Sequence, residues 1–279
     1  MTIQTWINHA EERLQKAGCP DAGLDARYIA AGVLKKSPGE IRFLGDTEIE
    51  KDALEIMNVR LDRREKGEPL QYIENTAYFM DFEFYVDENV LIPRQDTETL
   101  VELALKKIGG IQKPDVLDMC TGSGAIAVSL ALYRKDARVM ASDISNGALN
   151  VARKNALSTA ANVEFILSDL FESIPEKKYD LITINPPYLT REDMLTLQRE
   201  VQAEPSLALF GGDDGLDIYR RIARDVYRYL KPGGYVLLEV GLGQEKDVLT
   251  LFTNECTWES GVQKDLCGVD RVVWIRSKE

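Results

Sequence analysis

The sequence predicts an α/β fold in which a parallel β-sheet carries helices on both faces. From Asp115 to Ile275, short apolar segments alternate with longer segments of helical periodicity, which is the pattern of strand–helix–strand units. One segment, Tyr179–Ile184, is apolar and rich in β-branched residues, as expected of a strand buried on both faces. Acidic residues follow several of these segments, at the sheet edge where α/β proteins bind ligands.

The first part of the chain, residues 1–75, shows helical periodicity only. Gly18-Cys19-Pro20 ends the first helical pattern. Thr47 with Glu50 three residues later matches a capping box and predicts the start of a later helix. The first helix has apolar residues at helical spacing, namely Ile3, Ile7, Ala10 and Leu14. We therefore expect a small helical domain over 1–75.

A β-hairpin linker is predicted over 76–92, because Phe79, Phe82 and Phe84 are close to alternating. The remainder, 93–279, is predicted to form the α/β domain. Its expected strands are Val116-Leu117, Val139–Ala141, Val163–Leu167, Leu181–Ile184, Tyr235–Val240 and Val272–Ile275.

Composition limits the class of protein. The chain has 279 residues, 44% of them hydrophobic and 29% charged, which is ordinary for a globular protein. Four scattered cysteines and a single histidine make a zinc site improbable and indicate a reducing, cytoplasmic location. We expect no metal, no membrane span and no signal peptide. The net charge of −12 argues against an affinity based on neutralising nucleic-acid phosphates.

A glycine-rich loop, Asp118-Met119-Cys120-Thr121-Gly122-Ser123-Gly124, lies between the first strand and its helix. Its glycines permit a tight turn close to a ligand, and the following helix presents free N–H groups. Asp143 ends the second strand, where a carboxylate can accept hydrogen bonds from ribose hydroxyls. Asp169 and Leu170 follow the third strand, where an adenine ring could lie.

Two nucleotide cofactors fit such a loop, a nicotinamide dinucleotide and S-adenosylmethionine. A dinucleotide site would usually have a third glycine one helical turn further on, but the chain has Ala127-Val128 there. The stretch after the fourth strand, Asn185-Pro186-Pro187-Tyr188, offers an amide and a phenol but no proton donor suited to hydride transfer. These residues favour S-adenosylmethionine.

The same stretch predicts the chemistry. The prolines end the strand because they lack an N–H, and Asn185 is held extended before them. The Asn185 side-chain oxygen and the Pro186 carbonyl can accept both N–H bonds of a planar amine or amide, and their dipoles suit positive charge developing on its nitrogen. Tyr188 can stack on the planar group. We predict methylation of an sp² nitrogen.

The chain resembles the release factor glutamine methyltransferases (HemK/PrmC family) over nearly all its length. Besides the glycine loop and Asn-Pro-Pro-Tyr, the matching stretches are Glu68–Ile73, Val90–Arg94, Thr97–Glu102, Tyr179–Ile182, Glu204-Pro205, Leu209–Leu216, Tyr219-Arg220, Pro232–Gly234, Glu239–Gly241 and Asp270–Val272. The resemblance implies a seven-stranded Rossmann-like class I methyltransferase domain and a helical module that binds the release factor.

The resemblance also implies the substrate, which is the glutamine of the Gly-Gly-Gln loop in class I peptide chain release factors. Its amide would be gripped by Asn185, Pro186, Pro187 and Tyr188. Family cofactor contacts fall on Thr121, Gly122, Ser123, Gly124, Asp143, Leu170 and Asn185. We expect a monomer that does not bind nucleic acid directly.

Two alternatives stay open at this point. One is an N-methyltransferase of adenine or guanine amino groups in nucleic acid, and the other is a non-catalytic binding protein with the same fold. The chain also departs from the family pattern, with Cys120 at a usual glycine of the loop and Asn75 at another near the hairpin.

Overall fold

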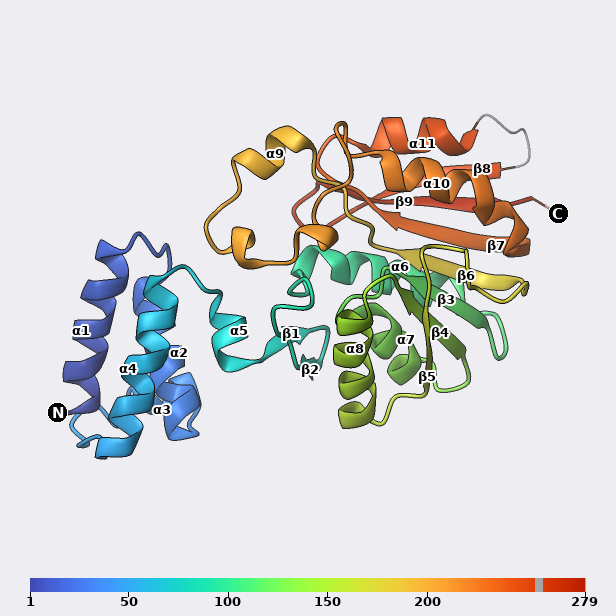
Figure 1. Ribbon diagram of the computed structural model, residues 1–279. Helices are drawn as coiled ribbons and strands as arrows, with labels where there is room; N and C mark the ends of the chain where they lie inside the picture. Colours follow the sequence, from blue (N-terminus) through green and yellow to red (C-terminus); the bar gives the residue numbers. More distant parts are fainter. Residues whose placement is uncertain (254–257, 279) are drawn as a thin grey trace. The chain divides into compact units, whose positions relative to one another are not determined.

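A computed structural model describes residues 1–253 and 258–278, and the chain in it forms two compact units (Figure 1). The first unit contains Met1–Thr76 together with Gln198–Ala203. The second contains Ala77–Leu197 and Glu204–Glu279. The return of residues 198–203 to the first unit has no counterpart in the domain division expected from the sequence.

The first unit is a bundle of short helices around one apolar core. The expected apolar face of the first helix is confirmed, since Ile3, Ile7, Ala10 and Leu14 are all buried, together with Trp6. The helices are α1 (Ile3–Lys16), α2 (Ala22–Leu34), α3 (Pro38–Ile41), α4 (Lys51–Glu65) and α5 (Leu70–Glu74).

The capping box predicted at Thr47 is wrong. Helix α4 has Glu50 at its N-cap and no side-chain cap. The carbonyl of Thr47 instead accepts a hydrogen bond from the N–H of Ile3 (3.0 Å), and its own N–H donates to the carbonyl of Leu44 (2.9 Å), so this residue lies in a turn next to the start of α1. The capping box of this unit lies at Ser37 and Glu40, which begin α3.

Arg64 on α4 is a buried cation of the first unit. Its Nε donates to Asp25 of α2 (2.7 Å), and its Nη2 donates to Glu200 (2.8 Å). The side chains of Arg64 and Asp25 are only 5% and 9% exposed. Residues 198–203 are thus bound to the helical bundle by a charge-assisted hydrogen bond.

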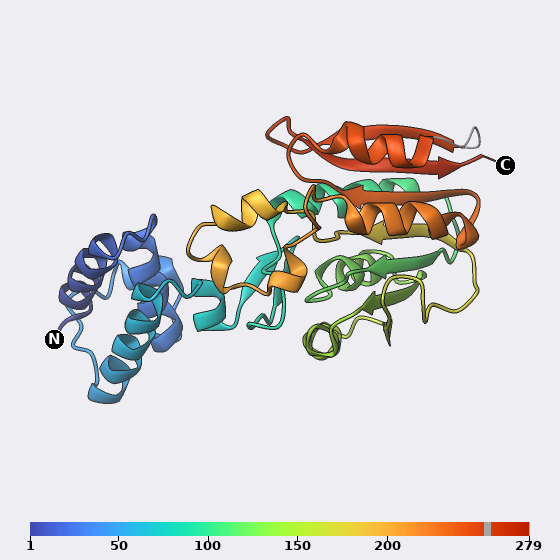
Figure 2. The same cartoon turned by 45° about the horizontal axis from the view of Figure 1, so that its top comes forward.

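The second unit is a seven-stranded sheet with the order β5-β4-β3-β6-β7-β9-β8 (Figure 2). Its strands are β3 (Asp115–Met119), β4 (Arg138–Asp143), β5 (Val163–Leu167), β6 (Tyr179–Ile184), β7 (Leu230–Glu239), β8 (Trp258–Lys264) and β9 (Asp270–Ser277). The sheet is mixed, because β9 pairs antiparallel with both β7 and β8. The expectation of a wholly parallel sheet is therefore wrong at β9. This strand follows β8 directly through a tight turn, which reverses its direction.

Helices cover both faces of this sheet, as predicted. Alternate strand residues face opposite sides, so Val116 packs in one core cluster and Leu117 in the other. The first cluster includes α6 (Glu98–Lys107), α7 (Ala125–Tyr133) and part of α8 (Asn146–Thr159), and the second includes α10 (Asp217–Asp225) and α11 (Glu245–Thr253).

The predicted hairpin is confirmed as β1 (Ala77–Phe79) and β2 (Phe82–Phe84). Phe79 and Phe84 are buried in the core of the second unit, where their rings meet edge to face. The predicted hairpin is therefore packed into the core of that unit.

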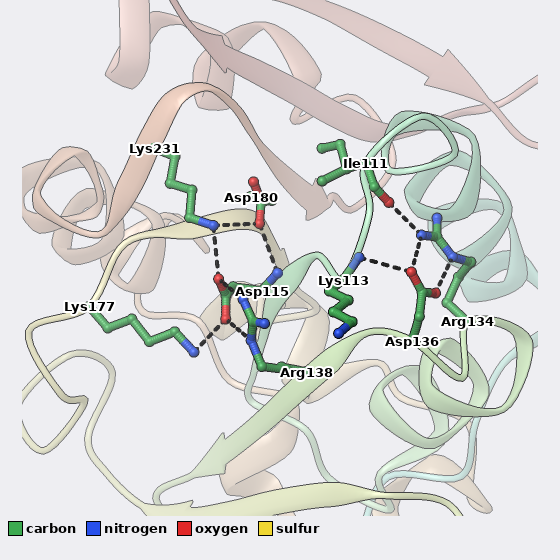
Figure 3. Close-up of polar contacts among 9 residues, drawn as sticks. All are labelled: Ile111, Lys113, Asp115, Arg134, Asp136, Arg138, Lys177, Asp180 and Lys231. Carbon is green, nitrogen blue, oxygen red and sulfur yellow. Dashed lines mark hydrogen bonds and ion pairs between the residues drawn. The ribbon is translucent and has the colours of Figure 1, made fainter.

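The amino-terminal ends of the central strands meet at Asp115, which is buried. Its carboxylate is paired with Arg138, Lys177 and Lys231, and Lys231 also contacts Asp180 (Figure 3). The hydrogen bond from Arg138, followed by those from the lysines, holds the pKa of Asp115 well below its usual value. This cluster joins β3, β4, β6 and β7 at the edge of the sheet opposite to the predicted ligand edge.

Along residues 1–253 and 258–278, no helix has the length and apolarity that a membrane crossing requires.

Candidate functional site

A cavity of about 270 Å³ lies at the carboxyl ends of β3, β4 and β6. Its other walls come from residues 89–97 and 205–208. Most residues expected at the site line it, namely Cys120, Thr121, Gly122, Ser123, Asp143, Asp169, Leu170, Asn185 and Pro187. The structure thus brings the glycine loop and the Asn-Pro-Pro-Tyr stretch to one cavity. Asp118, Gly124, Pro186 and Tyr188 do not line it.

The glycine loop makes the tight turn that its sequence suggested, through residues with a left-handed backbone. Gly122 and Gly124 have φ values of +54° and +80°, which side chains other than glycine rarely adopt. A Cβ at Gly124 would come within 3.0 Å of Ala152 on α8, whereas a Cβ at Gly122 would meet no atom within 4 Å. Gly124 therefore allows close helix packing, and Gly122 leaves space at the cavity wall.

Asp118 supports this loop from beneath. It is fully buried and accepts hydrogen bonds from the hydroxyls of Thr121 (2.6 Å) and Thr183 (2.7 Å). Burial raises its pKa to about 7. Because the carboxylate has no exposed surface, its effect on a bound ligand is transmitted through the shape of the loop.

Asp143 connects β4 to the loop. Its Oδ2 accepts from the N–H of Gly122 (2.8 Å), and its Oδ1 accepts from the N–H of Ser145 (2.8 Å). Burial raises the pKa of this carboxyl group. Each carboxylate oxygen can accept a second hydrogen bond, so Asp143 has acceptor capacity left for a ligand in the cavity.

Cys120 has a φ of +56°, a conformation that is uncommon for a residue with a Cβ. The position is therefore one that suits glycine. Burial, followed by the neighbouring Asp143 and Asp118, raises the pKa of the thiol. The cysteine thus contributes a neutral, half-buried thiol to the cavity wall.

Asn185 follows β6 directly. Its Nδ2 donates to the hydroxyl of Thr97 (3.4 Å), so the nitrogen end of the amide is engaged within the protein. Tyr188 is anchored through its backbone, since Gln244 donates to its carbonyl (3.0 Å). Burial raises the pKa of the Tyr188 phenol to about 12. The tyrosine therefore stays neutral near pH 7 and is unsuited to act as a base.

Two polar residues that sequence reasoning missed also shape the cavity. Asn155 of α8 donates to the carbonyls of Ser123 (2.9 Å) and Tyr85 (2.9 Å), which joins the glycine loop to the segment after β2. Glu204 accepts from the N–H of Ile92 (3.0 Å) and pairs with Arg94. For Asn155, the available sequence signal was an asparagine on the buried side of α8. Glu204 lies in a stretch that matches the family, but no role could be assigned to it from the sequence.

The cavity fits a nucleoside with an amino-acid tail. Gly122 leaves open space where a side chain would otherwise project, Asp143 offers free acceptor capacity, and Leu170 and Ile144 supply apolar wall. No described group of three or more histidine, cysteine, aspartate or glutamate residues has the arrangement of a metal site.

Fold and site together define a class I methyltransferase. The family model for the methyltransferase small domain matches residues 95–207. The guanine-N2 methyltransferase of 16S rRNA from Thermus thermophilus, solved with S-adenosylmethionine and guanosine, has a similar fold, with a TM-score of 0.53 over 73% of this chain and 50% of that one at 19% identity.

The family within this class follows from three further matches. The model of the PrmC N-terminal domain matches residues 5–74. A release factor glutamine methyltransferase of Geobacter sulfurreducens is 37% identical over 98% of this chain and 95% of its own length. A release factor glutamine methyltransferase of Leptospira interrogans is 39% identical over 98% of this chain and 97% of its own length. The chain belongs to the family of S-adenosylmethionine-dependent release factor glutamine methyltransferases.

Proposed function

We propose that this protein methylates the side-chain amide nitrogen of the glutamine in the Gly-Gly-Gln loop of class I peptide chain release factors. The observation that carries the proposal is the joint lining of one cavity by the glycine loop and by Asn185 and Pro187. Family membership supports the choice of a release factor as substrate.

S-adenosylmethionine, when bound, supplies an electrophilic methyl group. We assign it to the wall formed by Cys120, Thr121, Gly122, Ser123, Asp143, Asp169, Leu170 and Asn185, with Gly124 and Asp118 holding the shape of the loop behind that wall. Asp143 would accept hydrogen bonds from the ribose hydroxyls, and the N–H groups at the start of α7 would lie toward the amino-acid tail.

The reacting nitrogen is a poor nucleophile because its lone pair is delocalised into the carbonyl. Asn185 Oδ1 and the Pro186 carbonyl accept its two N–H bonds, and both dipoles stabilise positive charge that develops on the nitrogen. Pro187 and Tyr188 position the planar amide group. No side-chain base takes part, in agreement with the neutral Tyr188 phenol; the nitrogen releases its surplus proton to water once the methyl group has been transferred.

Residues 1–75 are proposed to hold the body of the release factor, and the enzyme is proposed to act as a cytoplasmic monomer without direct nucleic-acid contacts. The match of the family's N-terminal domain to residues 5–74 supports the first point.

The test incubates the protein with methyl-labelled S-adenosylmethionine and, in separate reactions, a release factor, tRNA, rRNA and DNA. We expect label on the release factor, located by peptide mass spectrometry on the glutamine of Gly-Gly-Gln. A release factor with alanine at that glutamine is the matched control and should stay unlabelled. Label on nucleic acid alone would replace the proposal with a nucleic-acid N-methyltransferase, and no label on any substrate would favour a binding protein.

A further inference from the structure

Glu239, the last residue of β7, is a buried acid to which the mechanism above gives no task. It is only 2% exposed. Among the described residues its Oε2 has no hydrogen-bond partner. Burying an ionisable side chain without a partner lowers the stability of the fold, which suggests that Glu239 has a role in the site.

The register of the sheet places Glu239 beside Asn185. Strands β6 and β7 are parallel neighbours, with Ile184 opposite Leu238. Asn185 and Glu239 each come one residue later, at the same carboxyl edge. Burial raises the pKa of Glu239, and the neighbouring side chains of Thr97 and Asn185 act to lower it. Asn185 Nδ2 in turn lies 3.4 Å from Thr97 Oγ1.

These contacts distinguish the two ends of the Asn185 amide. An ionised carboxylate only accepts hydrogen bonds, so it binds the NH₂ end and leaves Oδ1 for the cavity. A protonated carboxyl group can donate, and it can then bind Oδ1 instead. In that reversed state the amide presents N–H bonds toward the substrate, where an acceptor is required.

We propose that Glu239 is a positioning residue that, in its ionised form, fixes the Asn185 amide with Oδ1 toward the substrate nitrogen. The inference rests on the proposed function, because the orientation matters only if Asn185 accepts a substrate N–H. Thr97 is the second anchor of the same amide nitrogen.

The charge state of Glu239 varies close to neutral pH. Burial raises its pKa to about 7, Arg271 acts to lower it, and Asp96 acts to raise it. The phenols of Tyr188 and Tyr219 also face it and stay neutral at this pH, since their own pKa values are raised by burial. Activity should therefore fall as the pH drops through about 7 and Glu239 gains a proton.

The first experiment compares the wild type with Glu239→Gln, a replacement of similar shape that has no charge and can donate as well as accept. We expect kcat to fall roughly 10- to 100-fold, with KM for the release factor and Kd for S-adenosylhomocysteine unchanged. The step in log kcat near pH 7 should disappear. Glu164→Gln, which removes an exposed carboxylate from β5, should keep both kcat and the step.

An unchanged kcat, or a pH step that persists in Glu239→Gln, would overturn the proposal. So would a fall in activity accompanied by lost cofactor binding or a lower unfolding temperature, because that result describes a structural role. Thr97→Val provides a second variant, with an expected loss in kcat smaller than that of Glu239→Gln.

A measurement without substrate separates this inference from the proposed function. In protein labelled with ¹⁵N-asparagine, the Asn185 side-chain NH₂ signals, assigned by their absence in Asn185→Ala, should shift with a midpoint near pH 7 in the wild type and not in Glu239→Gln. If they titrate but no release factor is methylated, the proposed function fails and the positioning contact stands. If methylation occurs but the signals do not titrate, only the role of Glu239 fails.

Discussion

Asp143 accepts a hydrogen bond from the backbone N–H of Gly122 over 2.8 Å. This bond ties the end of β4 to the glycine loop that follows β3, and the neighbouring bond from Ser145 ties the same carboxylate to the start of α8. One acidic side chain thus sets the position of the loop and faces the cavity at the same time.

Asp143→Asn should weaken cofactor binding more than it weakens the fold. Asparagine has one acceptor oxygen, so its NH₂ group would face one of the two N–H donors of Gly122 and Ser145. We expect binding of S-adenosylhomocysteine to lose about 1–3 kcal/mol, roughly 10- to 100-fold in Kd, as measured by titration calorimetry. Asp247→Asn, on the exposed side of α11, is the control and should bind like the wild type. Equal affinities for the wild type and Asp143→Asn would contradict this prediction.

Asn185→Ala should separate catalysis from cofactor binding. Loss of the side-chain oxygen removes one of the two proposed acceptors, so kcat should fall roughly 100- to 1,000-fold, while Kd for S-adenosylhomocysteine changes little. Single-turnover assays with a release factor measure the first quantity and calorimetry the second. Asn162→Ala changes an exposed asparagine before β5 and should have wild-type activity. Full turnover by Asn185→Ala would remove this residue from the mechanism.

Asp118→Asn should alter the pH dependence of stability. The pKa of Asp118 is raised from 3.8 to about 7 by burial, so folding favours its protonated form. Its stabilising contribution is complete below about pH 4 and is lost as the pH rises toward 7. The asparagine variant does not titrate at this position. As the pH rises across this range, its free energy of unfolding minus that of the wild type should therefore increase, by at most about 4 kcal/mol. Urea unfolding at pH 5 and pH 8 measures the difference, and parallel pH curves would contradict the assignment.

Arg64→Met should destabilise the first unit strongly, because it leaves the buried Asp25 without its partner. We expect a loss of about 3–5 kcal/mol in chemical unfolding, with faster hydrogen exchange in α2 and α4. The pair Lys16 and Glu12, whose side chains are 73% and 63% exposed, is the matched comparison. Lys16→Met should leave the free energy of unfolding almost unchanged, because an exposed ion pair contributes little. Similar losses in the two variants would show that burial does not determine how much each ion pair contributes to the free energy of unfolding.

The sequence predicted the central strands well because β3, β4 and β6 are buried along almost their whole length and the second half of β7 is apolar. Strand β8 could not be found in the same way. Its sequence, Trp258 to Lys264, mixes two apolar residues with glycine and polar side chains, and it exists as a strand through its ladder with β9. Residues 254–257, which precede it, include Cys256 and lie outside the described part of the chain.

Part of the site could be predicted from the sequence and part could not. The glycine loop and Asn-Pro-Pro-Tyr are each one continuous stretch of sequence, so their residues could be named before the fold was known. Asn155 and Glu239 act on residues that are distant in the chain, Ser123 and Asn185, and only the packing of α8 and the register of β6 with β7 bring them together. No local periodicity carries that information.

The membership of residues 198–203 in the first unit has a consequence for dissecting the chain. The polypeptide passes between the units three times, after Thr76, after Leu197 and after Ala203. A fragment that stops at Thr76 would lack Glu200, one of the two carboxylates that pair with Arg64. The helical unit is therefore not formed by the N-terminal segment alone, and exchanging it between relatives would require transferring two separate segments of the chain.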